Sequence, residues 1–412
     1  MRFEDYRISP FIKQSLAELG FKRPTDIQYK AIPSILKRED VLAIAQTGTG
    51  KTAAFAIPVI NLINEQKKSV KPEGIRAVVM APTHELAIQI SEAFQQFGKY
   101  TKVKTFAIFG GTEQDPQIAR LIKGVDVLVA TPGRLFDLRS QGFIDLSTVE
   151  VLILDEADHM LDLGFIKDIE DLIRYLPKNR QTLFFSATIN EKIKKLAYSL
   201  VKNAIRIQIS PDDPVSKNIT HAVTFIGMDD KRFFLERIIK ENPDSKMVVF
   251  VRTKVRADRV VSAMERVGIK AMAIHSGKEH KERKLVMDSL KSGELKILVA
   301  TDVSARGIDI PNVDFVINYD IPEEPENYVH RIGRTGRGMQ KGQALSFCST
   351  EEQVLLSEIE KYMGKSIERL EISKEAYDET LIFTDEENHT WKDVFKEIEM
   401  AENYKPKKKK KK

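Results

Sequence analysis

The chain has 412 residues, of which 42% are hydrophobic and 30% are charged, and its formal net charge is +5. This length suggests two or three domains, and the composition is that of a folded globular protein and not of a disordered one. We expect no membrane span, because no apolar run approaches the roughly 20 residues that cross a bilayer, and no signal peptide, because the start MRFED lacks a basic and then apolar layout.

The cysteine content and the distribution of charge narrow the class of protein further. Cys348 is the single cysteine, so an internal disulfide is excluded, and its apolar flanks predict a small buried side chain. Together these features indicate a cytoplasmic protein. Seven lysines lie in the last eight residues, and removing their charges from +5 leaves −2 for the rest of the chain. Any basic surface for nucleic acid must therefore be local.

Short apolar runs alternate with longer amphipathic stretches, which is typical of strand–helix units in a mostly parallel sheet. We expect strands in the first half at 41–45, 77–81, 105–109, 125–130, 151–154 and 182–185. Residues 210–218 are rich in turn formers and predict an interdomain linker. Strands are then expected at 222–226, 247–251, 270–274, 297–300, 315–318 and 344–347. The expected fold class is α/β, with two doubly wound parallel-sheet domains at residues 1–209 and 219–364.

Residues 365–412 are interpreted as a C-terminal extension. The strand–helix alternation ends there, and an acid-rich segment has a partly helical pattern in which Trp391, Val394, Phe395 and Ile398 fall on one face. The run from Lys407 to Lys412 cannot pack a core and predicts a disordered tail. An electrostatic anchor for nucleic acid and a solvated tail without a specific role both stay open for this run.

The strongest single motif is AQTGTGKT at residues 45–52, between an apolar strand and an amphipathic helix. Gly48 and Gly50 let backbone N–H groups surround phosphate oxygens, while Lys51 reaches the β- and γ-phosphates and Thr52 can bind Mg²⁺. A structural turn is the alternative, but the strand–loop–helix context favours a nucleotide site. Ala45 departs from the usual glycine at the first position. The candidate nucleotide-binding residues of this loop are Gln46, Thr47, Gly48, Thr49, Gly50, Lys51 and Thr52.

Residues 151–158, VLILDEAD, supply the acidic half of a nucleotide-hydrolysing site. Four apolar residues place Asp155 at the carboxyl end of a buried strand, where ligand sites of α/β sheets form. Asp155 would hold Mg²⁺, and Glu156 would orient and polarise the attacking water. An acidic run after a strand is often only a solvated helix start, and its pairing with the upstream loop favours catalysis.

The letters DEAD at 155–158 resemble the box of the DEAD-box RNA helicases, and further motifs of that family occur in its order. Residues 20–28, GFKRPTDIQ, resemble its adenine-reading motif, with Phe3 as the upstream aromatic. This resemblance implies that Phe21 stacks on adenine, that Gln28 hydrogen-bonds the edge of the base, and that Arg23 belongs to the same site. Residues 186–188, SAT, resemble the motif that couples hydrolysis to strand separation. The implied coupling residues in this half are Asp158, Ser186 and Thr188.

Two motifs of the second half also resemble those of the family. Residues 300–309, ATDVSARGID, resemble the fifth motif, which implies that Asp309 lies near the ribose. Residues 330–337, HRIGRTGR, resemble the sixth. Arg334 and Arg337 would then stabilise the charge of the phosphoryl-transfer transition state, and His330 would join the coupling residues. Because these arginines and Lys51 lie in different domains, catalysis would need domain closure, which RNA can promote.

A track for single-stranded RNA needs donors to phosphates, not readers of base edges. Candidates that resemble RNA-contact motifs of the family lie at strand ends: Pro82, Thr83, His84, Gly110, Gly111, Thr131, Gly133, Arg134, Arg252, Thr253, Thr301 and Arg306. Singly, each is more often a turn or a helix cap. His84 stands where the family usually has arginine, and His280 where a glutamine helps to bridge the domains near the acidic box.

The resemblance covers about residues 1–364 and implies two RecA-like domains in tandem, ATP and Mg²⁺ as cofactors, RNA as partner and a monomeric state. It favours an ATP-hydrolysing RNA helicase that opens short duplexes or remodels RNA and ribonucleoprotein. Two alternatives stay open. The protein could be an ATP-gated RNA clamp in which hydrolysis only resets binding, or a DNA-directed motor with the same motifs.

Overall fold

A computed structural model of the chain describes residues 2–46, 48–69, 74–209, 215, 218–302, 310, 313–336 and 341–381. The chain divides into two compact units, Met1–Ser210 and Pro211–Lys412. Of the helices in these described ranges, none combines the length and the apolar character that crossing a membrane requires. Several predictions fall outside the described residues: those on Thr47, Arg306, Asp309, Arg337, most of the linker 210–218, the helix around 391–400 and the lysine tail, together with the side chain of His280.

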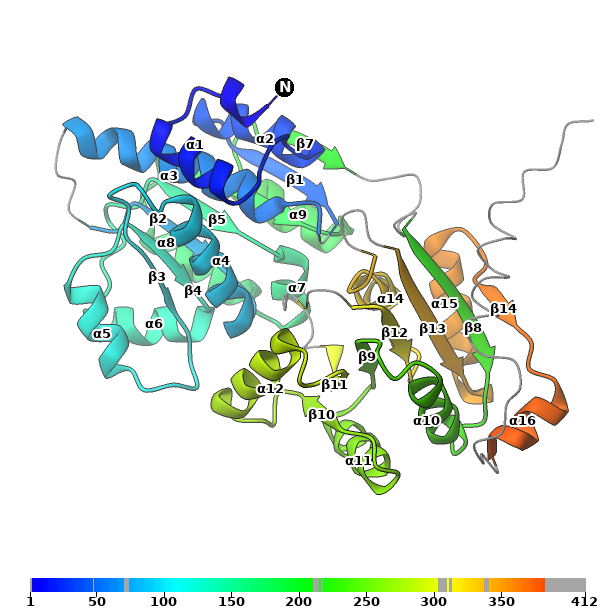
Figure 1. Cartoon of the computed structure of the whole chain (residues 1–412). Helices are drawn as coiled ribbons and strands as arrows, with labels where there is room; N and C mark the ends of the chain where they lie inside the picture. The colour runs from blue at the N-terminus through cyan, green and yellow to red at the C-terminus, as the bar shows by residue number, and fades with distance from the viewer. Residues whose placement is uncertain are drawn as a thin grey trace, which may run out of the picture. The chain divides into compact units, whose positions relative to one another are not determined.

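The first unit is built on a seven-stranded parallel sheet in the order β3-β4-β2-β5-β6-β1-β7 (Figure 1). Its strands are β1 (Val41–Ala45), β2 (Ala77–Met80), β3 (Thr105–Ile108), β4 (Val127–Ala130), β5 (Val151–Leu154), β6 (Gln181–Ser186) and β7 (Ile205–Ile209). All six strands expected in this half are present. β7 is an addition to that set, and it pairs with β1 at the edge of the sheet.

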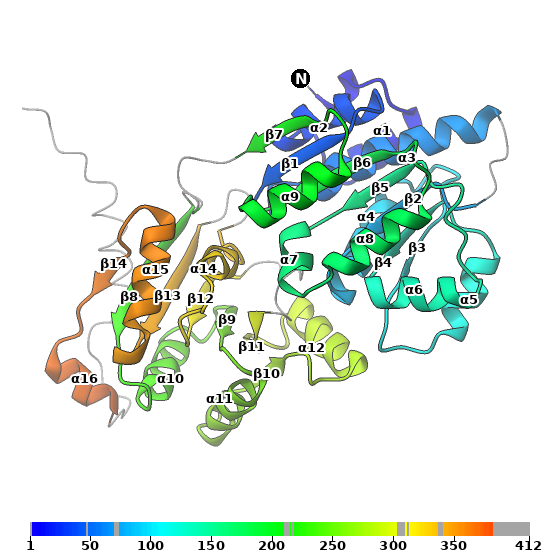
Figure 2. The same ribbon diagram turned by 180° about the vertical axis from the view of Figure 1, so that it is seen from behind.

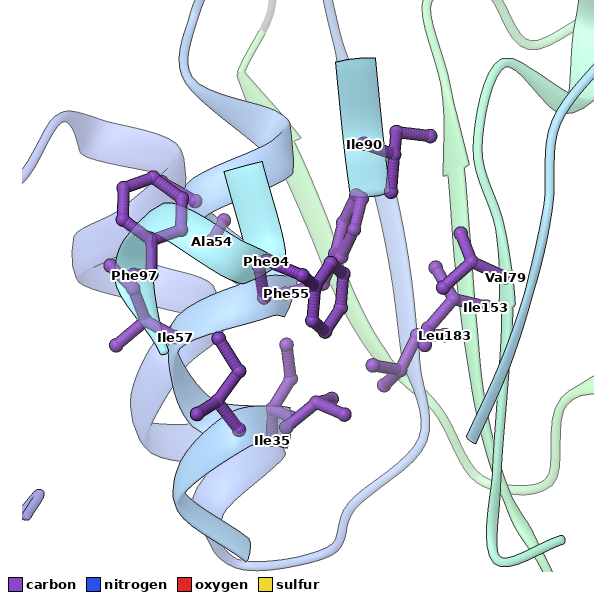
Figure 3. Packing of buried hydrophobic residues seen from close by; sticks show 14 of the residues in the cluster. Ile35, Ala54, Phe55, Ile57, Val79, Ile90, Phe94, Phe97, Ile153 and Leu183 are labelled. Atoms are coloured by element: carbon purple, nitrogen blue, oxygen red, sulfur yellow. The ribbon is translucent and has the colours of Figure 1, made fainter. Parts of the chain in front are cut away.

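Helices from the N-terminal half of this unit cover one face of the sheet. They are the 3-10 turn η1 (Phe3–Asp5), α1 (Pro10–Glu18), α2 (Asp26–Leu36), α3 (Lys51–Ser69) and α4 (His84–Phe97). Figure 3 shows Phe55 of α3 and Phe94 of α4 packed near Val79, Ile153 and Leu183 of the sheet. This contiguous core fixes the starts of α3 and α4, and both helices begin at candidate site residues.

The opposite face is covered by α5 (Asp115–Ile122), α6 (Pro132–Ser140), α7 (Ala157–Asp162), α8 (Ile166–Tyr175) and α9 (Glu191–Leu200) (Figure 2). Side chains alternate between the two faces, as strand geometry requires. Val78 and Leu152 point to this second core, whereas Val79 and Ile153 point to the first. Burial on both faces explains why these strands are almost continuous apolar runs.

The second unit contains another seven-stranded parallel sheet, in the order β10-β11-β9-β12-β13-β8-β14. Its strands are β8 (Ile219–Phe225), β9 (Met247–Phe250), β10 (Ala271–Ile274), β11 (Ile297–Ala300), β12 (Phe315–Asn318), β13 (Gly342–Cys348) and β14 (Glu368–Leu370). The six strands expected in this half are all present, and Cys348 is buried as expected. Two doubly wound parallel sheets confirm the expected fold class.

Helices again cover both faces of this second sheet. The helices α12 (His280–Ser292), α14 (Pro325–Ile332) and α15 (Gln353–Met363) contribute to one core, and α15 directly follows the 3-10 turn η2 (Thr350–Glu352). The opposite core receives α10 (Lys231–Glu241) and α11 (Lys254–Arg266).

The segment after residue 364 adds two elements to the second unit. β14 pairs with β8 at the edge of the sheet. α16 (Lys374–Leu381) packs on α10, where the rings of Tyr377 and Phe234 lie 4.9 Å apart and the Tyr377 hydroxyl donates to Asp230 at 2.7 Å. The boundary expected at 364 therefore lies before a strand that belongs to this sheet.

The parallel topology brings the candidate site residues of each unit to one edge of its sheet. In the first unit, the chain leaves β1, β2, β3, β4, β5 and β6 at or next to a candidate motif. The carboxyl edge of an open parallel sheet is where α/β proteins bind ligands. The same holds in the second unit for the residues after β9 and β11.

Candidate functional site

The loop between β1 and α3 has the backbone of a phosphate-binding turn. Gly48 and Gly50 have φ values of 80° and 90°, in the left-handed region that favours glycine. A Cβ atom on Gly50 would lie 2.4 Å from Nε2 of Gln28, so a side chain there would displace a neighbour. The second glycine is therefore required both by the backbone conformation and by the space around it.

Lys51 is the first residue of α3, and its ammonium group points back along the loop. Its Nζ donates to the carbonyl of Ala45 at 2.9 Å, and the side chain is buried. The hydroxyl of Thr49 donates to the carbonyl of Gln46 at 2.8 Å, which tightens the loop. Thr52 follows in the first turn of α3. A helix N-terminus with a lysine beside it favours an anion such as a phosphate group.

Gln28 connects α2 to this loop. Its Oε1 accepts from the backbone N–H of Thr25 at 3.0 Å, and its Nε2 donates to the carbonyl of Gly50 at 3.1 Å. The first bond belongs to the capping box that starts α2. One buried amide therefore fixes both the beginning of a helix and the position of the second loop glycine.

A cavity of about 500 Å³ opens beside Phe21. Phe21 packs edge-on against Phe3 and Phe97, with ring centroids 5.9 Å and 5.5 Å away. Aromatic and basic side chains dominate the lining, which consists of Arg2, Phe3, Glu4, Lys13, Leu16, Ala17, Phe21, Lys22 and Arg23. This volume lies in the range of small-ligand pockets. The structure thus brings Phe21 and Arg23 together at one cavity, whereas Gln28 contacts the loop.

Asp155 and Glu156 follow β5, as the sequence predicts. Burial raises the pKa of the Asp155 carboxyl to about 7, an effect that the Lys51 ammonium opposes and the Glu156 carboxylate increases. A carboxyl held in this way gains strongly from a nearby cation, because the cation favours its charged form. Glu156 has φ 50° and ψ 51°, a left-handed conformation that costs a non-glycine residue about 1–3 kcal/mol. Such strain is concentrated at functional sites.

Asp158 joins the acidic motif to the end of β6. Its Oδ2 accepts hydrogen bonds from the backbone N–H of Ala187 at 3.0 Å and from the N–H and hydroxyl of Thr188 at 2.9 and 3.1 Å. The hydroxyl of Ser186 donates to the carbonyl of Thr188 at 2.7 Å. The three predicted coupling residues of this unit therefore form one connected network.

His84 lies against the glycine pair after β3. Cβ atoms on Gly110 and Gly111 would be 3.9 and 3.6 Å from the His84 imidazole, and its ring centroid is 5.5 Å from that of Phe109. The structure brings these three predicted RNA-track residues together. Thr83 acts as the N-cap of α4, with its hydroxyl accepting from the N–H of Leu86 at 3.3 Å.

Residues after β4 contact the loop that follows β3. Arg134 donates from Nη2 to the carbonyl of Thr112 at 2.9 Å, and its Nε lies 3.7 Å from the carboxylate of Asp137. Its guanidinium group therefore anchors the segment that follows the glycine pair. Thr131 is buried and precedes α6, and Pro132 and the exposed Gly133 begin that helix. Pro82, after β2, is also buried.

In the second unit, Arg252 is already held by acidic partners. Its Nη2 donates to Glu352 at 2.9 Å and to the carbonyl of Ile321 at 3.3 Å. Glu352 also pairs with the fully buried Lys231 at 2.5 Å. Thr253 is the N-cap of α11, and its hydroxyl accepts a backbone hydrogen bond. Both predicted track residues thus have structural roles in this unit.

The residues around α14 are organised by Arg331. It makes two hydrogen bonds to the carboxylate of Asp302, at 2.6 and 2.8 Å, and a third to the carbonyl of Asp320 at 2.6 Å. Arg334 is buried, and its Nε donates to the carbonyl of His330 at 3.3 Å. Since Asp302 follows Thr301, this fork joins the ends of β11 and β12 to the helix that carries both His330 and Arg331.

Comparison with known proteins agrees with these motifs. The DEAD/DEAH box helicase model matches residues 25–196, and the helicase conserved C-terminal domain matches residues 230–339. The ATP-dependent RNA helicase DbpA of Bacillus subtilis is 40% identical over 370 residues, which cover 90% of this chain and 76% of that protein. The ATP-dependent RNA helicase RhlB of Shewanella frigidimarina is 41% identical over 382 residues, covering 91% of this chain and 87% of that protein.

This chain belongs to the DEAD-box helicase family. Membership confirms the expected enzyme class, an ATP-hydrolysing helicase. Among solved structures, S. cerevisiae Dbp5 bound to RNA and ADP BeF3 has a TM-score of 0.83 and 30% identity, covering 97% of this chain and 99% of that chain. The DEAD-box helicase Mss116 bound to ssRNA and UDP-BeF has a TM-score of 0.83 and 29% identity, covering 93% of this chain and 82% of that chain.

Two buried side chains, one in each unit, were not among the candidate residues predicted from the sequence. His159 is buried, and its Nδ1 lies 3.6 Å from Oε2 of Glu156. Arg331 is one of the largest fully buried side chains in the described part of the chain. A signal for both was present in the sequence, because His159 directly follows the letters DEAD and Arg331 is the second residue of the motif HRIGRTGR. Neither contact partner can be read from the sequence without the fold.

Proposed function

We propose that this DEAD-box helicase is an RNA-dependent ATPase that locally unwinds short RNA duplexes or remodels RNA and ribonucleoprotein. The observation that carries the proposal is the network from the phosphate loop to the end of β6. Asp155 is coupled electrostatically to Lys51, and Asp158 is bonded to Ala187 and Thr188. A change at the nucleotide therefore has a direct physical route to the residues of the predicted coupling motif.

The nucleotide would bind across the loop and the cavity beside Phe21. The aromatic face of Phe21 and the basic side chains of the lining suit a purine base, and the start of α3 with Lys51 suits its phosphates. Gln28 would lie between the base and the phosphates, because its amide is bonded to Gly50 of the phosphate loop. Asp309 would lie near the ribose by resemblance, although it is outside the described residues.

The donor set also fits Mg²⁺. The Asp155 carboxyl is buried and strongly stabilised by any positive charge, and the Thr52 hydroxyl follows Lys51 in the first turn of α3. Hard divalent cations take oxygen ligands of this kind, usually together with substrate phosphates. When bound, the cation would neutralise charge on the phosphates. We propose Thr52 and Asp155 as its protein contacts.

Hydrolysis adds water to the γ-phosphorus while the bond to the bridging oxygen breaks, giving ADP, inorganic phosphate and a proton. We assign the orientation of that water to Glu156, and the stabilisation of the charge in the transition state to Lys51, Arg334 and Arg337. Because the arginines and the phosphate loop belong to different units, we propose that the domains 1–209 and 219–364, joined by residues 210–218, close on ATP and RNA.

RNA would bind through its backbone along the strand ends. The cluster of His84, Gly110 and Gly111 offers backbone N–H groups and one imidazole, and Arg134 bonds the carbonyl of Thr112, the residue after Gly111. In the second unit we propose Arg252, Thr253, Thr301 and Arg306 as contacts. Two similar solved structures, of Dbp5 and Mss116, are bound to RNA together with a nucleotide analogue, which supports both ligands. We also propose that the protein acts as a monomer in the cytoplasm.

The deciding experiment measures ATP hydrolysis with and without single-stranded RNA for the wild type, Glu156→Gln and the control Glu170→Gln. Glu170 is exposed on α8, so its variant carries the same charge change away from the site. We expect RNA to stimulate the wild type and the control strongly and Glu156→Gln hardly at all. Hydrolysis that ignores RNA would reject the proposed function.

A second assay separates the proposed function from its two alternatives. Strand displacement on short duplexes is measured with ATP and without it. An RNA clamp would bind and hydrolyse ATP without displacing a strand. A DNA-directed motor would hydrolyse ATP equally well with DNA and with RNA of the same length. Displacement of RNA duplexes that requires ATP, with little response to DNA, is the expected result.

A further inference from the structure

We infer that His159 is a positioning residue that holds the carboxylate of Glu156 in the orientation needed to direct the attacking water. The inference rests on the proposed function, because it concerns the residue to which that function assigns the water. It adds a side chain that lies outside the four-letter acidic motif and has no role in the mechanism described above.

The two side chains meet on the first turn of α7. Glu156 is the N-cap of this helix and His159 lies three residues further on, a spacing that puts side chains on the same face. Nδ1 of His159 is 3.6 Å from Oε2 of Glu156. The His159 side chain is 3% exposed and that of Glu156 is 11% exposed, so little water is available to replace this contact.

Backbone contacts restrict where the imidazole can lie. The N–H of His159 donates to Oδ1 of Asp158 at 3.2 Å, while the other oxygen of that carboxylate holds Ala187 and Thr188. Glu156 itself is fixed in a left-handed conformation. Both side chains therefore start from constrained backbone positions, and the remaining freedom of the Glu156 carboxylate is rotation about its side-chain bonds.

The separation of 3.6 Å exceeds a hydrogen bond, but a small rotation of either side chain would close it. Catalytic hydrogen bonds are often long in ligand-free enzymes and shorten when substrate binds. With Nδ1–H donating to Oε2, the second oxygen of Glu156 remains available to accept from water. Without this donor, the carboxylate would sample several rotamers, and the water would be oriented in only a fraction of the bound complexes.

The competing explanation is that His159 only fills space under α7. A buried imidazole without a polar partner is costly compared with an apolar residue of similar size, so pure packing would favour leucine or methionine here. Met160, the next residue, is fully buried in the apolar core and is a side chain that packing alone explains. The Glu156 carboxylate, 3.6 Å from Nδ1, is the acidic group placed to become the partner of His159.

The test compares three substitutions that separate the donor from the volume. In His159→Asn the side-chain nitrogen is attached to Cγ and can occupy the place of Nδ1. In His159→Gln the nitrogen lies one bond further out, near the place of Nε2, and His159→Leu has no donor. Met160→Leu is the packing control. The measurements are kcat and KM for ATP at saturating single-stranded RNA, RNA affinity and thermal unfolding.

We expect kcat to fall roughly tenfold in His159→Leu and His159→Gln. KM for ATP and RNA affinity should stay within about threefold of the wild type, because an interaction made mainly in the transition state affects kcat. His159→Asn and Met160→Leu should keep kcat within about threefold of the wild type. Recovery with asparagine but not with glutamine would identify the Nδ1 position as the one that matters.

Two results would overturn the inference. One is a wild-type kcat in His159→Leu, and the other is an equal loss in the asparagine and glutamine variants. If the leucine variant does not fold, the asparagine and glutamine pair still decides the question. A wild-type protein without RNA-stimulated hydrolysis is a different result, because it would reject the proposed function itself.

Discussion

Thr188 donates two hydrogen bonds to the same carboxylate oxygen of Asp158, from its backbone N–H at 2.9 Å and from its hydroxyl at 3.1 Å. Asp158 follows β5 and Thr188 follows β6, and these two strands are neighbours in the sheet. Hydrogen bonds to a charged acceptor are worth about 1.5–3 kcal/mol, more than those between neutral groups. Asp158 therefore restrains the segment after β6 while belonging to the same four-residue motif as the proposed water-orienting Glu156.

Thr188→Val should separate hydrolysis from strand displacement. The substitution removes the hydroxyl bond but retains the backbone bond and the shape of the side chain. We expect displacement of a short RNA duplex to fall about tenfold, since the lost bond to a charged group is worth at least about 1.5 kcal/mol, with RNA-stimulated hydrolysis within about threefold. Thr101→Val, which removes a hydroxyl that bonds the carbonyl of Gly98, is the control. Equal losses of both activities in Thr188→Val would contradict a coupling role.

Gly50→Ala should weaken ATP binding through Gln28. Both the positive φ of Gly50 and the 2.4 Å approach of a Cβ atom to Nε2 of Gln28 oppose a side chain there. Gly124→Ala is a matched control, because Gly124 has φ +83° but open space around its Cβ position. Each substitution should cost about 1–2 kcal/mol of stability from the left-handed backbone.

The two glycine variants should differ in their KM for ATP. We expect KM to rise at least about tenfold in Gly50→Ala, because the displaced amide can no longer hold both Thr25 and the loop and each such bond is worth about 1 kcal/mol. Gly124→Ala should keep the wild-type KM. Urea unfolding measures the shared loss of stability, and steady-state kinetics measure KM. A similar KM in the two alanine variants would show that Gln28 does not support the nucleotide site.

The central strands could be predicted because both faces of the sheets are buried, which produces unmistakable apolar runs. β7 and β14 lie at sheet edges and lack this pattern. β7, with the sequence IRIQI, has only Ile207 buried, and β14 has three residues, of which Glu368 and Arg369 are exposed. Whether such segments join a sheet depends on the neighbouring strand and not on their own composition.

The location of the site could be predicted, because the carboxyl ends of parallel strands lie at the same edge of a sheet. Candidate residues after six strands of the first unit lie at one edge for this reason. Individual contacts could not be predicted, because they depend on side-chain directions. Arg134 bonds the carbonyl of Thr112, Arg331 forks onto Asp302, and Arg252 pairs with Glu352. Arg134 and Arg252 are candidate RNA contacts that also have a protein partner, whereas Arg331 was not a candidate.

The ion pair of Glu360 with Arg369 should make the attachment of β14 sensitive to acid. The hydrogen bond from Arg369 is the largest of the effects that hold the pKa of Glu360 below its ordinary value of 4.5, and the N–H of Ile367 donates to the same carboxylate at 2.6 Å. A carboxylate with a lowered pKa in the folded state stabilises the fold above its unfolded pKa. That stabilisation is lost as pH falls through the folded pKa.

Comparing Glu360→Gln with the wild type isolates this effect. At pH 6 to 7 the variant should be less stable by about 1 kcal/mol, a modest value because Arg369 is partly exposed. The difference should shrink below pH 4.5 and vanish once Glu360 is protonated in the wild type. Urea unfolding between pH 3 and 7 measures it. A stability difference that does not change with pH would mean that the ion pair contributes nothing.

His84→Arg should tighten the binding of single-stranded RNA. His84 lies beside Gly110 and Gly111 at the proposed track, and arginine would replace the imidazole with a permanently charged group that has several donors. One more phosphate contact should steepen the plot of log K against log salt concentration by about 0.7 and tighten binding several-fold at low salt. Gln96→Arg is the control. Gln96 is exposed near the far end of the same helix, α4, so its substitution adds the same charge away from the track. A salt dependence that is unchanged in His84→Arg, or equally steep in both variants, would show that the position of His84 does not contact a phosphate.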